Sequence, residues 1–200
     1  MKLAIDEGSG ARSADVALLT EAASGKPDAV RQLLDDAGPV VYGFLYGRVG
    51  GNPAVAEDLV QETLLEAVRS SHTFRGESAL TTWLCTIARR RLARYYESER
   101  KADVTRAGLS LVRDVPDHAE EDVDQADEVL RALGRLSASH RQVLVMKYLD
   151  EMHVAEMAAE LGKTKVQIQS LLQRARESLR REMSPEGPAS GSNDGVDSND

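Results

Sequence analysis

The segment from residue 79 to residue 101 carries the side chains best suited to bind a nucleic acid. At helical spacing, Trp83, Arg90 and Arg94 share one side, and Arg89 and Arg91 lie at its flanks. Guanidinium groups bind phosphates in a bidentate manner, and an indole ring offers a surface on which an unstacked base can stack. The pattern predicts a DNA-binding surface. A core tryptophan with arginines in solvent is the alternative interpretation.

An acidic stripe precedes this segment, over residues 55–68. Asp58, Glu62 and Glu66 repeat at every fourth position, and Gln61 lies beside them. Like charges at this spacing repel one another by roughly a few tenths of a kcal/mol per pair, so a basic partner would stabilise the helix that carries them. Taken alone, such a charge run is usually a solvated helix face, and a docking surface for a basic partner is the alternative.

Residues 154–182 have the spacing of a helix-turn-helix. That motif needs a small residue where its helices cross, a glycine in the turn and an apolar anchor on the second helix. Ala158, Gly162 and Ile168 stand at these places. Thr164 can cap the second helix, and Gln167 can return the hydrogen bond as in a capping box.

The outer face of the second helix is polar and partly basic. Amide side chains suit adenine edges, and arginine suits guanine or a phosphate. A helical pair that merely packs is the alternative, and the gathering of basic residues around this turn disfavours it. The candidate DNA contacts are Lys163, Thr164, Lys165, Gln169, Ser170, Gln173, Arg174 and Arg176.

Helices must position all of these groups, because no alternating run of apolar and polar residues supports a β-sheet. Apolar periodicity, punctuated by glycine and proline, predicts an all-α chain. We expect helices at residues 14–24, 28–37, 39–50, 53–71, 79–100, 125–136, 138–149, 154–161 and 165–182.

The net charge of −8 over 200 residues is unevenly distributed. Residues 102–128 carry −7 and residues 183–200 carry −4, whereas residues 129–182 carry +4. The acidic stretches lack sustained helical periodicity, which predicts two helical domains on an acidic linker. The expected boundaries are 1–13 for a flexible N-terminus, 14–101 for the first domain, 102–124 for the linker, 125–183 for the helix-turn-helix domain and 184–200 for a disordered acidic tail.

The sequence lacks the residues that several classes of function require. The single cysteine, Cys85, cannot form an internal disulfide, and no cysteine and histidine cluster has the spacing of a zinc site. No nucleophile and base set and no phosphate-cradling glycine loop is present, so we expect neither an enzyme nor a cofactor. No apolar run reaches the ~18 residues of a membrane span, so we expect no membrane insertion and a cytoplasmic location.

Three segments, taken in order, resemble a known family. They read DLVQETLLEAV from Asp58, TFRGESALTTWLCTIARRRLARYY from Thr73 and LSASHRQVLVMKYLDEMHVAEMAAELGKTKVQIQSLLQRARESLRRE from Leu136. Together they are similar to a small two-domain bacterial sigma factor of the extracytoplasmic-function (ECF) group of the sigma-70 family. The resemblance covers residues 14–182.

This resemblance implies that the first domain binds the clamp helices of the RNA polymerase β′ subunit through Asp58, Gln61 and Glu62. The loop at residues 71–78 would hold a flipped base of the promoter −10 element. The implied −10 contacts are Arg75, Trp83, Arg89, Arg90 and Arg94. The second domain would read the −35 element in the major groove and face the β flap. An anti-sigma factor is a further partner that the resemblance implies.

Some positions depart from the family pattern. Many members carry asparagine in place of Arg90, aspartate in place of Arg94 and basic residues in place of Gln169 and Leu171, so no promoter sequence preference is carried over. A stand-alone helix-turn-helix regulator is the alternative function, but it does not explain the acidic stripe and the arginine-rich helix together. A helical adaptor that binds only protein is a third class, and it would leave the basic C-terminal face unused.

Overall fold

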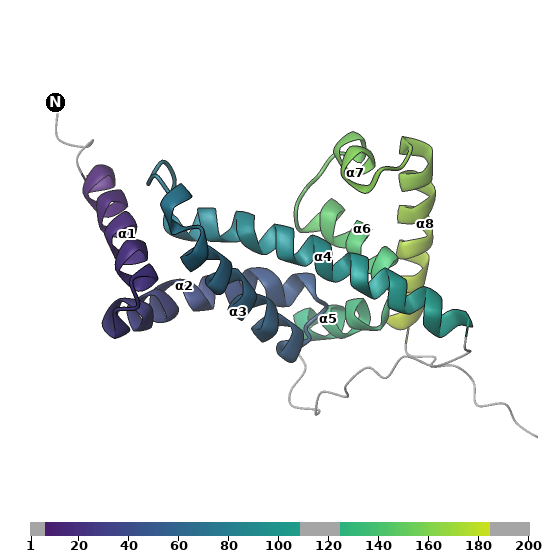
Figure 1. Cartoon of the computed structure of the whole chain (residues 1–200). Coiled ribbons are helices and arrows are strands. Elements are labelled where there is room, and N and C mark those ends of the chain that lie inside the picture. Colours follow the sequence, from purple (N-terminus) through teal and green to yellow (C-terminus); the bar gives the residue numbers. More distant parts are fainter. Residues whose placement is uncertain (1–6, 109–124, 185–200) are drawn as a thin grey trace, which may run out of the picture.

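The computed structural model describes residues 7–108 and 125–184, and these residues form α-helices and one short 3-10 turn without any β-strand (Figure 1). The predicted all-α fold is confirmed. Most of the predicted linker and tail, and residues 1–6, lie outside the described part. The elements are α1 (Glu7–Ala23), α2 (Pro27–Arg48), α3 (Pro53–Arg69), η1 (Ser71–Thr73), α4 (Leu80–Gly108), α5 (Gln125–Arg135), α6 (Ala138–Tyr148), α7 (Val154–Leu161) and α8 (Lys165–Glu182).

Helices α1 to α4 form an N-terminal bundle around one apolar core. Helix α4 has 29 residues and is therefore about 43 Å long. Figure 1 shows it running from the α1 end of this bundle to the foot of α8. The same helix therefore belongs to the N-terminal core and reaches the C-terminal helices.

Helix α2 contradicts the prediction of two helices at residues 28–37 and 39–50, because it is continuous through Pro39. A proline inside a helix removes one backbone hydrogen bond and usually ends or kinks the helix. Here Pro39 lies on the exposed side, while the opposite side buries a residue at every fourth position on both sides of the proline. Burial of this stripe outweighs the local cost of Pro39. The stripe consists of Ala29, Leu33, Ala37, Val41 and Leu45.

Two further helix boundaries differ from those predicted. Helix α1 begins at Glu7 rather than at residue 14, and its Asp15 accepts a hydrogen bond from the Leu80 amide at 3.2 Å. Helix α4 continues to Gly108, into the predicted linker, and its Asp103 accepts a hydrogen bond from the Ala138 amide at 2.8 Å. In both cases, a hydrogen bond to a residue distant in sequence stabilises extra helical turns. The local periodicity of the sequence does not predict these turns.

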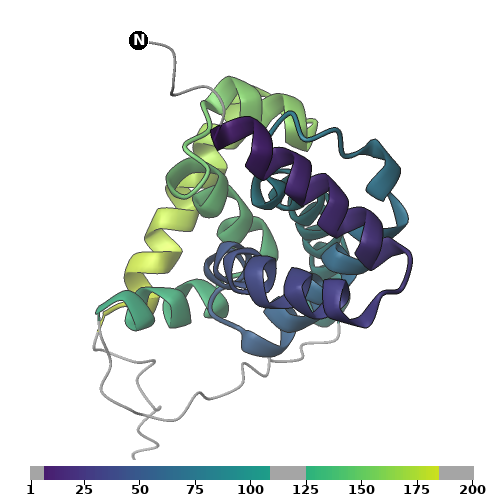
Figure 2. The ribbon, with the colours of Figure 1, turned by 90° about the vertical axis from the view of Figure 1, so that its left-hand side faces the viewer.

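Helices α5 to α8 form a second bundle around their own core, to which Met157, Ile168 and Leu172 contribute. The two bundles touch where α6 packs against α4, and Figure 2 shows α1 and α2 on one side of the molecule and α6 to α8 on the other. None of the described helices is long and apolar enough to cross a membrane.

The backbones of the two bundles come close together at two glycines. A Cβ atom at Gly134 of α5 would lie 2.7 Å from the Gly50 carbonyl oxygen, and Gly50 itself has a φ of +73°. A side chain at Gly134 would therefore push the backbones apart. Gly43 of α2 is a matched contrast, because a Cβ atom there would meet nothing within 4 Å.

We predict opposite effects of alanine at these two helical glycines. Gly43→Ala should raise the free energy of unfolding by about 0.5–1 kcal/mol, because it restricts the unfolded chain without creating a clash. Gly134→Ala should lower it by about 1–3 kcal/mol, because the added methyl overpacks the contact with Gly50. Urea unfolding followed by circular dichroism measures both values, and equal stabilisation by the two substitutions would contradict the close approach.

Candidate functional site

The acidic stripe lies on the outer face of α3. Asn52 caps this helix by accepting a hydrogen bond from the Val55 amide at 3.2 Å, and Pro53 occupies its first turn. The opposite face is buried against the N-terminal core. Asp58, Gln61 and Glu62 are all exposed, as their helical spacing predicts.

An arginine from α4 partly neutralises this face. Arg91 donates to a Glu66 carboxylate oxygen at 2.9 Å and to a Glu62 carboxylate oxygen at 3.4 Å, while its own side chain is only 19% exposed. The sequence placed Arg91 at the flank of the DNA-binding side. In the structure it pairs with two carboxylates of the acidic stripe and offsets their repulsion, and it also lines a surface hollow with Trp83, Arg90 and Arg94.

An apolar residue within this face escaped the sequence analysis. Leu65 is 57% exposed, and it follows Gln61 by one helical turn and Asp58 by two. The same i, i+4 and i+7 spacing could have identified it. We define the docking face as Asp58, Gln61, Glu62 and Leu65.

Three of the five predicted −10 contacts come together beside α4. Trp83, Arg90 and Arg94 line one surface hollow, together with Ser70 and Thr73 from the end of α3 and from η1. Both arginines are exposed, and an aromatic ring beside two guanidinium groups suits a base with its phosphates.

The tryptophan also has a structural role. The Trp83 ring is half-buried and packs on the Phe74 ring, with centroids 5.1 Å apart and planes tilted by 44°. The interpretation of Trp83 as a core residue is therefore correct for the part of the ring that packs on Phe74. The rest of the ring lines the surface hollow. The two other predicted contacts lie elsewhere. Arg75 is exposed in the loop before α4, and Arg89 points to the C-terminal bundle, 3.9 Å from Asp150.

The helix-turn-helix has the local structure that its sequence predicts. Gly162 ends α7 with a φ of +62°, in the left-handed region. The Gln167 amide donates to the Thr164 hydroxyl at 3.2 Å, and the Gln167 side chain accepts from the Thr164 amide at 2.8 Å. This reciprocal pair is the predicted capping box. Ile168 and Leu172 are buried and fix α8 on its bundle.

All eight predicted contacts of the outer face are exposed around the start and middle of α8, from Lys163 to Arg176. Arg176 is held by Tyr148 of α6, whose hydroxyl accepts a hydrogen bond at 2.8 Å. Burial lowers the pKa of His140, and the nearby Arg174 and Arg181 lower it further. The last two effects report a local excess of positive charge, which suits a phosphate backbone.

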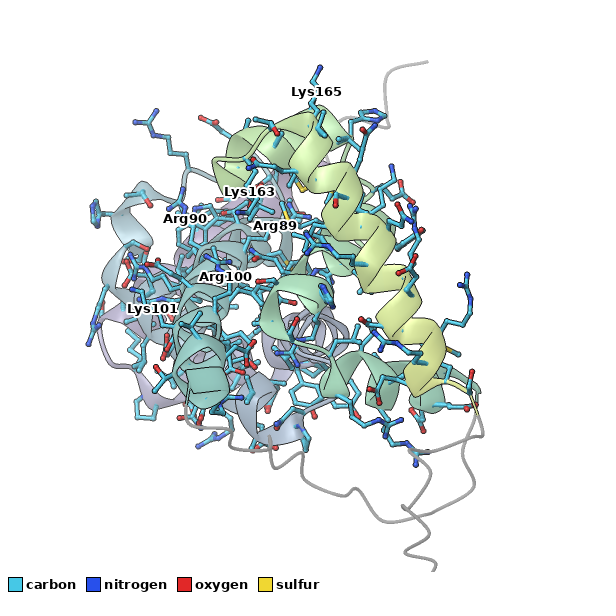
Figure 3. The ribbon with its side chains drawn as sticks, turned by 90° about the vertical axis from the view of Figure 1, so that its right-hand side faces the viewer. Arg89, Arg90, Arg100, Lys101, Lys163 and Lys165 are labelled. Carbon is cyan, nitrogen blue, oxygen red and sulfur yellow. The ribbon has the colours of Figure 1, made fainter. Side chains whose placement is uncertain are left out.

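The basic residues of this outer face do not all point the same way. Lys163 lines a cleft between the bundles together with Arg94 and Arg100 of α4. Figure 3 shows Lys165 projecting outward at the start of α8. The predicted −35 surface therefore borders the predicted −10 surface in this arrangement.

Comparisons with known proteins agree with this organisation. The family model for sigma-70 region 2 matches residues 33–102, and the model for sigma-70 region 4 matches residues 126–179. The chain is 34% identical over 169 residues to the ECF RNA polymerase sigma factor BldN of Streptomyces coelicolor, which covers 82% of this chain but only 64% of BldN. This chain therefore spans less than two thirds of the length of BldN.

Two further relatives match over most of their own length. The ECF RNA polymerase sigma factor SigL of Mycobacterium tuberculosis is 31% identical over 170 residues, covering 82% of this chain and 94% of SigL. The solved structure of the sigma factor RpoE in complex with the anti-sigma factor NepR, from Bartonella quintana, is 27% identical with a TM-score of 0.46, covering 77% of this chain and 96% of that chain.

The capping box gives a direct test of the local structure of α8. Thr164→Ala should lower the free energy of unfolding of the C-terminal bundle by about 1 kcal/mol, because the Gln167 amide loses its acceptor. Thr164→Ser is the matched control and should retain the wild-type value, since it keeps the hydroxyl. Urea unfolding followed by circular dichroism measures both, and an alanine variant as stable as the serine variant would count against the cap.

Proposed function

This chain belongs to the ECF group of the sigma-70 family, and from that premise we propose that it binds core RNA polymerase and directs promoter-specific initiation of transcription. It would bind the enzyme through the first bundle, recognise and melt the −10 element there, and read the −35 element with the second. The chemistry of transcription stays with the polymerase, so the chain itself has no catalytic role in this proposal.

The observation that carries this proposal is the order of three surfaces along one chain. An acidic docking face on α3 is followed by an aromatic and arginine-lined hollow beside α4 and then by an exposed helix-turn-helix. The region 2 and region 4 matches coincide with the two bundles in the same order. A stand-alone regulator accounts for the last surface alone.

The docking face fits a basic partner with an apolar centre. Glu62 and Asp58 supply negative charge at the solvent side of α3, and Leu65 offers apolar area between them and the end of the helix. Protein interfaces combine a central apolar contact with a polar rim in this way. We assign this face to the clamp helices of the polymerase β′ subunit.

The DNA contacts follow from the two basic surfaces. In the first bundle we assign the −10 element to Arg75, Trp83, Arg89, Arg90 and Arg94. In the second we assign the −35 element to the outer face of α8 and its turn, beside the β flap of the polymerase. The cytoplasm is the proposed place of action, and an anti-sigma factor is a proposed antagonist.

Run-off transcription with purified core polymerase tests the proposal. The chain should convert the core enzyme into one that initiates at defined positions on a library of promoter fragments. A stand-alone regulator would leave the core enzyme without specific starts and would footprint on DNA by itself. An adaptor would give neither result, so the three classes separate in one assay.

Charge reversal on the docking face should abolish polymerase binding. Asp58→Arg with Glu62→Arg should leave the fold intact, because exposed charge changes usually move stability by less than about 0.5 kcal/mol. Co-purification with core polymerase should then be lost through repulsion. Asp35→Arg with Asp36→Arg, on the exposed side of α2, is the control with the same change in charge. Equal co-purification of both double variants with the polymerase would refute the docking face.

Substitutions in the helix-turn-helix should separate base reading from backbone contact. Gln173→Ala and Arg174→Ala should change promoter choice in the upstream element, since a single base contact is worth roughly 1–3 kcal/mol. Lys163→Ala should weaken all promoters alike, because a phosphate contact carries no sequence information. Run-off yields across a promoter library measure the difference, and uniform weakening by all three variants would exclude it.

A further inference from the structure

One carboxylate of the C-terminal bundle lies in a basic site of the N-terminal bundle. Asp150, which follows α6, accepts hydrogen bonds from Arg48 Nη2 at 2.7 Å and Arg48 Nε at 3.1 Å through a single oxygen. The side chains of Arg48 and Asp150 are only 12% and 14% exposed. This pair joins residues 102 positions apart and is largely shielded from water.

Helix α2 holds the Arg48 guanidinium in place without help from Asp150. The group lies over the Phe44 ring, 3.7 Å from its centroid, and donates to the Phe44 carbonyl at 2.8 Å. An arginine fixed in this way remains a prepared anion site when its carboxylate partner leaves.

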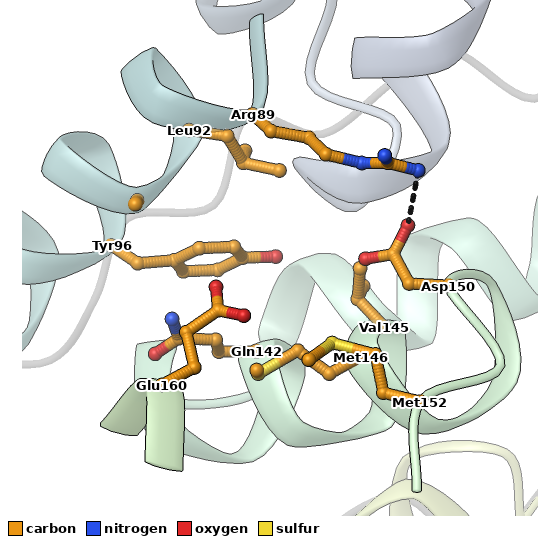
Figure 4. Close-up of a pocket in the computed structure, with 10 residues that line it drawn as sticks. Arg89, Leu92, Tyr96, Gln142, Val145, Met146, Asp150, Met152 and Glu160 are labelled. Atoms are coloured by element: carbon orange, nitrogen blue, oxygen red, sulfur yellow. Dashed lines mark ion pairs between the residues drawn. The ribbon is translucent and has the colours of Figure 1, made fainter. Parts of the chain in front are cut away.

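A second guanidinium completes the site. Arg89 of α4 lies 3.9 Å from the same Asp150 oxygen, and Figure 4 shows the two side chains pointing toward each other across the cleft between the bundles. Arg89 is 58% exposed and also lies near the Phe44 ring, at 5.5 Å. Two positive charges thus face one negative charge, a balance that suits a phosphate at least as well as a carboxylate.

We infer that Asp150 is an internal competitor of DNA: in the free protein it occupies an anion site, formed by Arg48 and Arg89, that takes a backbone phosphate of the promoter once the C-terminal bundle moves away. The inference rests on the proposed function, because that proposal assigns Arg89 to the −10 element. It adds Arg48 as a phosphate contact and Asp150 as the group that blocks it.

Geometry requires the bundles to separate before both promoter elements can be read. The centres of elements at −10 and −35 are about 25 base pairs apart, which is roughly 85 Å along B-DNA. Helix α8 has 18 residues and is about 27 Å long, and it packs on α6, which packs on α4. The two reading surfaces are therefore far too close together in the closed arrangement.

Negative charge from a second helix reinforces the competition. Glu160 of α7 lines the same cleft as Arg89 and Asp150, and it also lines the neighbouring cleft with Arg94 and Arg100 of α4. Arg100 of α4 is bound across the interface by the Gln142 side chain. The C-terminal bundle thus covers one flank of the predicted −10 surface with groups that a DNA backbone would replace.

DNA binding by the free protein tests this inference. The probe is a fluorescent 30-base-pair duplex of arbitrary sequence, with its single strand as a second probe, at ~0.15 M salt. Asp150→Asn should bind both probes about three- to tenfold more tightly, because apparent affinity rises with the fraction of molecules in which the site is open. Glu151→Gln is the matched control, since it removes the same charge from the adjacent exposed residue.

A double variant identifies the site that is released. Arg48→Gln in the Asp150→Asn background should cancel the gain in affinity. An equal gain from Asp150→Asn and Glu151→Gln would reduce the effect to net charge and overturn the inference. No gain, or a gain that persists without Arg48, would overturn it as well.

A measurement on the unmodified chain covers the case in which Asp150→Asn does not fold. Saturating DNA should accelerate amide hydrogen exchange over α6 and the loop that carries Asp150, and unchanged exchange there would contradict the inference. None of these experiments contains polymerase. A negative result combined with specific run-off transcription would therefore remove the internal competitor and leave the proposed function standing.

Discussion

The arrangement of the two bundles depends on one buried cation, the Arg141 guanidinium of α6. This residue is only 1% exposed, and its side chain donates to the Val49 carbonyl at 3.4 Å, the Gly134 carbonyl at 3.3 Å and the Tyr95 hydroxyl at 3.3 Å. A buried charge is costly unless its partners are all in place, and the nearest carboxylate, that of Glu99, is 3.9 Å away. Two of these acceptors, the Val49 carbonyl and the Tyr95 hydroxyl, belong to the N-terminal bundle, whereas the buried Arg141 Nε has no hydrogen-bond partner among the described residues. Arg141 therefore ties α6 to the N-terminal bundle at the cost of one unsatisfied N–H group.

The interface between the two bundles is specific, and the bundles can still separate from each other. Several of its contacts are polar: Arg141 with the Val49 carbonyl, Arg48 with Asp150, and Asp103 with the start of α6. One apolar residue of α6, Ala138, is buried in the core of the N-terminal bundle. Each of the polar groups can exchange its protein partner for water or for another charged ligand, whereas an apolar interface would lose its stabilisation outright. The buried Tyr96 phenol, whose pKa is raised by burial, donates to the Arg48 carbonyl and stiffens the N-terminal side of the junction. A closed resting state and an open working state are thus compatible with one set of side chains.

The sequence predicted the features that local chemistry controls. The capping box of Thr164 and Gln167 and the turn at Gly162 involve neighbours in the chain, and they match the structure. Pro39 predicts a break in α2, but the long buried stripe on the opposite face keeps this helix continuous. The partners of Arg91 and Arg48 could not be predicted, because each pair joins separate helices: α4 with α3, and α2 with the loop after α6. The spacing of residues in the sequence predicts which face of a helix carries a side chain. The packing of the helices decides which residues that face contacts.

The proposed function and the internal competitor together require the closed two-bundle chain to open in a complex with core polymerase. Single-molecule energy transfer between labels at Asp35→Cys on α2 and Glu177→Cys on α8, in a Cys85→Ala background, tests this opening most directly, since both labelled positions are exposed. We expect one short distance between the labels in the free protein and a distance longer by tens of ångströms when core polymerase is added. A distance that stays the same in the polymerase complex, or that is already long in the free protein, would contradict it.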